Sequence, residues 1–205
     1  MNSLLKEINI WKEEINYLRE KSKAYTENEN LIAFYGSSSI RLWDNMASDL
    51  APYETLNLGF GGSSYKWCDH FFGEVFEFIQ PTGIIIYAGD NDLGTGTLEN
   101  DIMNNVNNLL TKTETVFGDI PTSIISVKPS PDRLYLKKNI ESLNRRLSQE
   151  IRQITNGSFI DIYTPMLTPE GKVRPELYLE DQLHMNLNGY EIWKKVIKDH
   201  LDSNS

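Results

Sequence analysis

Three residues that lie far apart in this sequence have side chains suited to nucleophilic catalysis: Ser38, Asp181 and His184. Asp181 precedes His184 by three positions, a spacing at which a carboxylate on a turn can reach the Nδ1 atom of the imidazole. Such an aspartate fixes the tautomer of the histidine and leaves Nε2 free to take a proton from a serine hydroxyl. Isolated Asp-x-x-His pairs also occur by chance at helix starts, so the pair supports a catalytic triad only if a serine and an oxyanion site lie beside it.

Ser38 follows a short apolar run, residues 31–35, that stops at Gly36 and is succeeded by three serines. The run predicts a buried parallel strand, and ligands of open α/β folds gather where such strands end. A serine in this turn is therefore well placed for attack on a substrate. Taken alone, the same Gly-Ser-Ser-Ser is more typical of a turn whose serines cap the next helix.

Two further turns contain candidate hydrogen-bond donors for an oxyanion. Residues 59–64 are rich in glycine, and Asn91 follows the apolar strand 84–88. The backbone N–H groups of Ser38 and Gly62 and the amide of Asn91 could face one developing negative charge, with Gly61 as the alternative glycine. The glycines lack the spacing of a dinucleotide fingerprint, and Ile40 stands where the nucleophile elbow of α/β-hydrolases requires its second glycine.

The elements that must position these residues alternate between strand and helix. Apolar runs predict strands at 31–35, 55–58, 84–88, 123–127 and 158–162. Between and after them, helices are expected at 41–50, 65–79, 98–116, 140–154 and from 187 onward, while residues 164–180 are too irregular for a standard element. This alternation predicts an α/β fold, a parallel sheet covered on both faces with right-handed crossovers. Such a fold brings the candidate residues to one edge of the sheet.

The first 30 residues are expected to form an amphipathic helix and a polar connection. Its apolar positions recur at spacings of three and four: Leu4, Ile8, Trp11, Ile15 and Leu18. We expect a structural role for this helix. No interior linker or repeat suggests a domain break, so residues 1–205 are expected to form a single domain. Residues 1–7 lack the apolar stretch of a secretory signal, and a cytoplasmic location is expected.

Composition excludes several classes of partner and cofactor. The 205 residues have a formal net charge of −9, which argues against nucleic acid and against anionic membrane surfaces. Cys68 is the only cysteine, so an intramolecular disulfide is impossible, and a Cys/His metal site is not expected with only three histidines spread along the chain.

Four blocks in this sequence resemble the signature blocks of the SGNH (GDSL) hydrolases. They occur in the family's order: Gly36-Ser37-Ser38, the segment 57–62, Gly89-Asp90-Asn91-Asp92 and Asp181-Gln182-Leu183-His184. The segments 35–41 and 128–131 further resemble a bacterial branch of GDSL-type esterases. The resemblance extends from about residue 31 to the last helix. Ser37 departs from the pattern, because the family name has aspartate at this place.

The resemblance implies a three-layer αβα flavodoxin-like fold with a central five-stranded parallel sheet. It places the nucleophile on Ser38, the oxyanion glycine and asparagine on Gly62 and Asn91, the general base on His184, and its orienting acid on Asp181. The expected activity is that of a cofactor-free serine esterase or acylhydrolase acting on a small ester. A carbohydrate O-acetyl ester or a thioester is an alternative substrate for the same site.

Two other function classes fit parts of the sequence. Asp90-Asn91-Asp92 after a buried strand is similar to the Asp-x-Asp motif of magnesium-dependent haloacid-dehalogenase phosphatases. However, the residues that follow are out of register with that motif, and Ser38 and His184 would have no role. A non-catalytic binding module on the same scaffold would predict a damaged triad, whereas every matching position is filled. Four aromatic residues near the motifs could line a pocket or belong to the core: Tyr35, Trp43, Phe60 and Trp67.

Overall fold

The structure is a computed structural model that describes residues 3–204, with side chains from residue 8 onward. Five strands form one parallel sheet in the order β2-β1-β3-β4-β5. The strands are β1 (Leu31–Gly36), β2 (Glu54–Gly59), β3 (Gly83–Tyr87), β4 (Thr122–Ile125) and β5 (Gly157–Ile160). This confirms the expected five-stranded parallel sheet, and the strand order is the flavodoxin-like one.

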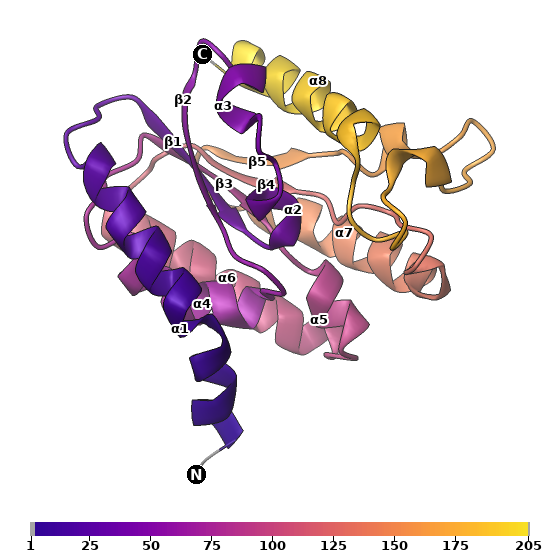
Figure 1. The fold of residues 1–205 in the computed structure, drawn as a ribbon, viewed down its shortest axis with the longest axis horizontal. Helices are drawn as coiled ribbons and strands as arrows, with labels where there is room; N and C mark the ends of the chain where they lie inside the picture. The colour runs from indigo at the N-terminus through magenta and orange to yellow at the C-terminus, as the bar shows by residue number, and fades with distance from the viewer. Residues whose placement is uncertain (1–2, 205) are drawn as a thin grey trace.

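Helices cover both faces of the sheet (Figure 1). They are α1 (Ser3–Ser22), α2 (Ser38–Arg41), α3 (Met46–Asp49), α4 (Tyr65–Val75), α5 (Asp90–Gly94), α6 (Glu99–Phe117), α7 (Lys137–Ile151) and α8 (Leu187–Ser203). Single 3-10 turns lie at η1 (Lys23–Tyr25), η2 (Leu134–Leu136), η3 (Thr164–Met166) and η4 (Pro175–Leu177). Apolar residues of α1, α4, α6 and α7 pack on one face, and those of α2, α3 and α8 pack on the other, which confirms the three-layer αβα architecture.

The strands feed two separate cores because successive side chains point to opposite faces of a sheet. In β3, Ile84 and Ile86 belong to the core under α4 and α6, whereas Ile85 and Tyr87 belong to the core under α8. All five residues of β3 are buried. A strand covered on both faces must be apolar throughout, which explains the continuous apolar runs in the sequence.

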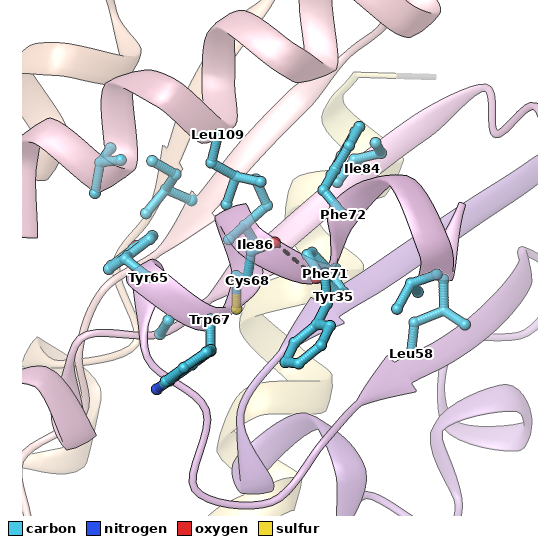
Figure 2. Packing of buried hydrophobic residues seen from close by; sticks show 14 of the residues in the cluster. Tyr35, Leu58, Tyr65, Trp67, Cys68, Phe71, Phe72, Ile84, Ile86 and Leu109 are labelled. Atoms are coloured by element: carbon cyan, nitrogen blue, oxygen red, sulfur yellow. Dashed lines mark hydrogen bonds between the residues drawn. The ribbon is translucent and has the colours of Figure 1, made fainter. Parts of the chain in front are cut away.

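The four aromatic residues near the motifs belong to these cores. Tyr35, Phe60 and Trp67 lie in the first core and Trp43 in the second, each no more than 6% exposed. The hydroxyl of Tyr35 donates a hydrogen bond of 2.8 Å to the carbonyl oxygen of Cys68 on α4 (Figure 2). Burial also raises the pKa of the Cys68 thiol. Tyr35, Phe60 and Trp67 therefore hold the sheet and helices together, whereas the largely buried Trp43 also borders a pocket lined by residues of α1, α3 and β2.

Three predicted helices have different boundaries in the structure. The helix expected at 41–50 is two short helices, α2 and α3, separated by a turn. The indole of Trp43, in this turn, donates at 2.8 Å to the carboxylate of Asp49, the last residue of α3. Helix α4 ends at Val75 rather than near Ile79, although Ile79 stays buried in the core. Helix α7 ends at Ile151, because the start of β5 packs so closely that a Cβ on Gly157 would lie 2.0 Å from the Ile151 carbonyl oxygen.

The amphipathic helix expected at the N-terminus is confirmed as α1. Trp11, Ile15 and Leu18 are buried against the first core and Ile8 is partly buried, whereas the side chain of Leu4 lies outside the described residues. Within residues 3–204, every helix is too short or too polar to cross a lipid bilayer.

Candidate active site

A strained glycine turn places Ser38 at the carboxyl end of β1. Gly36 has φ +147°, and a Cβ at this position would lie 1.9 Å from the carbonyl oxygen of Tyr87 on β3. Only glycine permits this approach, and the next residue, Ser37, donates its N–H to the same carbonyl at 2.9 Å. Ser38 is then the first residue of α2 and stays partly exposed. The alternative, a serine capping the helix, is wrong for the N-cap residue Ser37, whose side chain makes no capping hydrogen bond.

Ser38, His184 and Asp181 form a continuous chain of hydrogen-bonding contacts. The Nε2 atom of His184 lies 3.1 Å from the Oγ of Ser38, and its Nδ1 atom lies 2.6 Å from the Oδ2 of Asp181. With the proton on Nδ1, the ring donates to Asp181 and its Nε2 accepts from the serine hydroxyl. The structure thus brings the three residues together at the edge of the sheet. Such an arrangement can remove the hydroxyl proton as the oxygen attacks a carbonyl.

Asp181 is held in its charged form. Partial burial works to raise its pKa, but hydrogen bonds from the His184 ring and from the backbone N–H groups of Leu183 and His184 outweigh it and lower the pKa to about 2. The two backbone bonds, 3.0 and 2.9 Å, use Oδ1 and leave Oδ2 for the imidazole. A carboxylate in this state favours the tautomer with the proton on Nδ1.

The loop that carries Asp181 and His184 is fastened to the N-terminus of α8. Asn186 is the N-cap of this helix: its Oδ1 accepts from the N–H groups of Asn188 and Gly189, and its Nδ2 donates to the Tyr178 carbonyl at 3.0 Å. The amide N–H of Leu179 also donates to the carbonyl of His184 at 2.8 Å. The irregular segment before α8 is therefore ordered by hydrogen bonds that close the loop around the histidine.

The glycine turn after β2 offers two different environments for its glycines. Gly61 has its N–H bonded to the carboxylate of Glu14, at 3.2 and 3.1 Å to the two oxygens. Gly62 has φ +70°, lies exposed, and a Cβ built on it would meet nothing within 4 Å. Since the N–H of Gly61 is already engaged, the N–H of Gly62 is the better candidate for a donor to a ligand.

Asn91 and Asp92 tie the turn after β3 to the turn after β2. The side-chain amide of Asn91 donates to the carbonyl of Ser63 at 2.9 Å, which leaves its second N–H for another acceptor. Both carboxylate oxygens of Asp92 accept from the N–H of Tyr65 at 3.1 Å. Burial raises the pKa of Asp92 to about 6, against the effect of these backbone bonds. The two loops that hold candidate oxyanion donors are therefore cross-linked.

Asp90, the other carboxylate of this motif, forms a buried ion pair. The ammonium of Lys128 lies 3.1 Å from Asp90 Oδ2, and the Nε of Arg133 lies 3.6 Å from Oδ1. The Lys128 side chain is only 1% exposed, so this buried ion pair fixes Asp90, the first residue of α5. Asp90 and Asp92 thus have separate protein partners. Among residues 3–204, no cluster of three or more His, Cys, Asp and Glu side chains could hold a metal ion.

Two residues of the second block position Ser38 in a way that the sequence did not reveal. The amide of Asn57 donates to the carbonyl of Ile40 at 2.6 Å, and its oxygen accepts from the N–H of Gly59 at 3.0 Å. A Cβ on Gly59 would lie 2.3 Å from the backbone nitrogen of Arg41. The end of β2 therefore packs directly against α2. The sequence feature that could have indicated these contacts is an asparagine two residues before a glycine, Asn57 and Gly59.

A model of the GDSL-like lipase/acylhydrolase family matches residues 29–192. The chain belongs to this family. It is therefore a hydrolase that acts on ester bonds, and the resemblance of the four sequence blocks is confirmed at the level of the family.

Solved structures of other proteins share this fold. A candidate platelet activating factor from Streptococcus pneumonia superposes with a TM-score of 0.80 at 18% identity, over 98% of this chain and 100% of that one. A GDSL-like lipase from Bacteroides thetaiotaomicron gives 0.73 at 22% identity, over 91% and 98%. An acetylxylan esterase from Geobacillus stearothermophilus gives 0.70 at 13% identity, over 82% and 92%. Among curated proteins, none matches this chain.

Proposed function

We propose that this GDSL-family hydrolase is a serine esterase that cleaves small carboxylic esters through Ser38, His184 and Asp181. The observation that carries the proposal is the chain of contacts from Ser38 Oγ to His184 Nε2, at 3.1 Å, and from His184 Nδ1 to Asp181 Oδ2, at 2.6 Å. The serine alone is a weak nucleophile, and the adjacent base activates it.

In the proposed first step, Ser38 Oγ attacks the ester carbonyl carbon while His184 Nε2 takes the hydroxyl proton. The carbonyl oxygen becomes an oxyanion, which accepts hydrogen bonds from the N–H groups of Ser38 and Gly62 and from the Asn91 amide. The tetrahedral intermediate then collapses: the bond to the leaving alkoxide breaks, and His184 gives the alkoxide its proton. Asp181 stabilises the imidazolium that exists between these transfers.

In the second step, water hydrolyses the acyl-enzyme by the same route. His184 takes a proton from the water as it attacks the acyl carbon, and returns the proton to Ser38 Oγ as the acid departs. Ser38 and His184 are both partly exposed, so water can reach the ester. Neither step requires a cofactor, because His184 accepts and returns every proton that moves among Ser38, the leaving alkoxide and water.

The proposed substrate is a small, soluble ester, which can enter from water because the site opens to solvent. His184 has a side chain 28% exposed and Asp181 one 48% exposed, and Gly62 is exposed as well. A panel of acyl esters, acetylated sugars and thioesters separates the alternatives by their kcat/KM values. A preference for acetylated sugars would assign a carbohydrate O-acetyl esterase, and a preference for thioesters would assign a thioesterase.

Labelling with a fluorophosphonate probe tests the nucleophile directly. The expected result, with EDTA present throughout, is one adduct that peptide mapping places on Ser38 and that is lost in His184→Ala. Esterase activity that EDTA abolishes, or a folded protein without a labelled serine, would contradict the proposal and favour the phosphatase or the binding module.

A further inference from the structure

Helix α1 holds both backbone groups of Gly61. The indole Nε1 of Trp11 donates to the Gly61 carbonyl oxygen at 2.6 Å, and the Glu14 carboxylate accepts from the Gly61 N–H at 3.1 and 3.2 Å. Trp11 and Glu14 are one helical turn apart, so their side chains lie on the same side of α1. The helix precedes residues 29–192, the part of the chain that the family model matches. Its contact with the glycine turn is therefore a feature additional to the family's blocks.

The indole of Trp11 is itself fixed by rings on both sides of that turn. Its centroid lies 6.4 Å from the ring of Phe60, which precedes Gly61, and 4.7 Å from the ring of Trp67 on α4. Trp11 is only 9% exposed. Aromatic pairs at such distances stabilise their arrangement beyond the area that they bury. The donor of the hydrogen bond to Gly61 is therefore held rigidly.

Arg41 connects the same carboxylate to the helix of the candidate nucleophile. Its Nε lies 3.5 Å from Glu14 Oε1, and a Cβ built on Gly61 would lie 3.2 Å from its guanidinium carbon. Arg41 is the last residue of α2, which begins at Ser38. The guanidinium offsets the negative charge of Glu14, a charge that would otherwise oppose formation of an oxyanion nearby.

Gly62 has no comparable support of its own. It is exposed, and nothing lies within 4 Å of the place of its missing Cβ. Two successive glycines also have wide conformational freedom. A donor N–H stabilises an oxyanion only if it is already aimed at that position before the reaction. The Gly62 N–H belongs to the same planar peptide as the Gly61 carbonyl oxygen, so a group that holds this carbonyl also sets the direction of the N–H.

We propose that Trp11 and Glu14 are positioning residues of this hydrolase: they fix the Gly61 peptide and thereby aim the N–H of Gly62 at the oxyanion. This inference rests on the proposed function, in which Gly62 is an oxyanion donor. The N-terminal helix, expected from the sequence to be purely structural, is then a part of the active site's support.

Kinetics of three variants test the role in catalysis. Trp11→Phe keeps a ring but removes the N–H donor, Glu14→Gln keeps one acceptor oxygen but removes the charge, and Glu14→Ala removes both. We expect kcat to fall by about 10-fold or more, towards the 10²- to 10³-fold loss typical of a missing oxyanion donor, with KM within about twofold. Glu14→Ala should lose more than Glu14→Gln. Glu13→Gln, the same change at an exposed neighbour on α1, should leave kcat unchanged.

Amide hydrogen exchange across residues 59–64 provides a readout that does not need activity. The Gly61 amide should exchange faster in Glu14→Ala than in the parent protein, and at the parent rate in Glu13→Gln. Faster exchange with unchanged kcat in an active enzyme would overturn the inference, as would unchanged exchange. A parent protein that is inactive and unlabelled at Ser38 would refute the proposed function, and the exchange rates would then still decide whether α1 fixes the loop.

Discussion

The Nε2 atom of His184 lies 3.1 Å from the Oγ of Ser38, although the two residues are 146 positions apart in the chain. Two independent devices produce this contact. A glycine at φ +147° turns the chain after β1 so that Ser38 begins α2, and a loop fastened to the N-cap of α8 presents the imidazole above it. The contact therefore requires both the turn after β1 and the loop before α8. It also distinguishes Ser38 from the serines on either side.

Ser38→Ala is expected to lower kcat by roughly 10⁴- to 10⁶-fold, the range seen when the nucleophile of a serine triad is removed. Initial rates on a short-chain ester, with circular dichroism to verify folding, provide the measurement. Ser37→Ala and Ser39→Ala are the matched controls: these neighbours are 2% and 4% exposed, and Ser38 is the one in contact with His184. Both should retain activity within about 10-fold. Loss of activity in one control, with activity retained in Ser38→Ala, would mean that the control serine and not Ser38 is the nucleophile.

Asp181→Asn is expected to lower kcat by about 10²- to 10⁴-fold with little change in stability. An amide NH₂ facing Nδ1 would make that nitrogen an acceptor, move the proton to Nε2 and leave no base for the Ser38 hydroxyl. The pKa of Asp181 is about 2, so the carboxylate is ionised at any pH above about 4. The parent protein should therefore remain faster than Asp181→Asn at every pH from about 6 to about 9, as rate measurements across that range would show. A variant as fast as the parent protein within this range would mean that Asp181 does not orient the base.

Asn91→Ala is expected to lower kcat by about 10²- to 10³-fold while KM stays nearly unchanged, because an oxyanion donor acts on the transition state. Single-turnover and steady-state kinetics on one ester separate the two parameters. Asn104→Ala, an exposed asparagine on α6, is the control and should behave like the parent protein. An increase in KM at constant kcat would instead make Asn91 a ground-state binding residue.

Much of this architecture could be predicted from local sequence. The apolar run 84–88 and the glycine after it are enough to predict a buried strand and the turn at its end, since period and turn chemistry act within a few residues. Asp181 and His184 could be paired because they are three positions apart. Ser38 and Asn91 could be placed at one edge of the sheet because each follows a predicted parallel strand, whereas their roles and that of His184 came from the resemblance to the SGNH hydrolases.

The supporting contacts could not be predicted, because they join residues that no local pattern relates. Trp11 was predicted from its spacing to be a core residue of an amphipathic helix, and it is buried, but its indole N–H donates to Gly61, 50 positions away. The predicted helix 41–50 failed for a similar reason, since the Trp43 indole bonds to Asp49 across the turn between α2 and α3. Such contacts depend on tertiary packing rather than on periodicity.

Asp92→Asn is expected to destabilise the protein more at low pH than at neutral pH. Burial raises the pKa of Asp92 from 3.8 to about 6, so between these values the folded protein holds a proton that the unfolded chain has released. Stability from this proton is fully present below about pH 3.8 and is lost as pH rises through about 6. Asparagine does not titrate. The difference in unfolding free energy between parent and variant should therefore shrink by on the order of 2 kcal/mol from pH 4.5 to pH 7.5.

Urea unfolding of both proteins at these two pH values measures the difference, and Asp119→Asn provides the control because Asp119 lies in a loop with an exposed side chain. Its effect on stability should be small at both pH values. Asp92 also faces the nearby charge of Asp90, which acts in the same direction as burial. A difference for Asp92→Asn that stays constant with pH would mean that this carboxylate is ionised in the folded protein throughout. The Tyr65 N–H, whose bonds to Asp92 cross-link the two loops with candidate oxyanion donors, would then donate to a carboxylate that stays charged at both pH values.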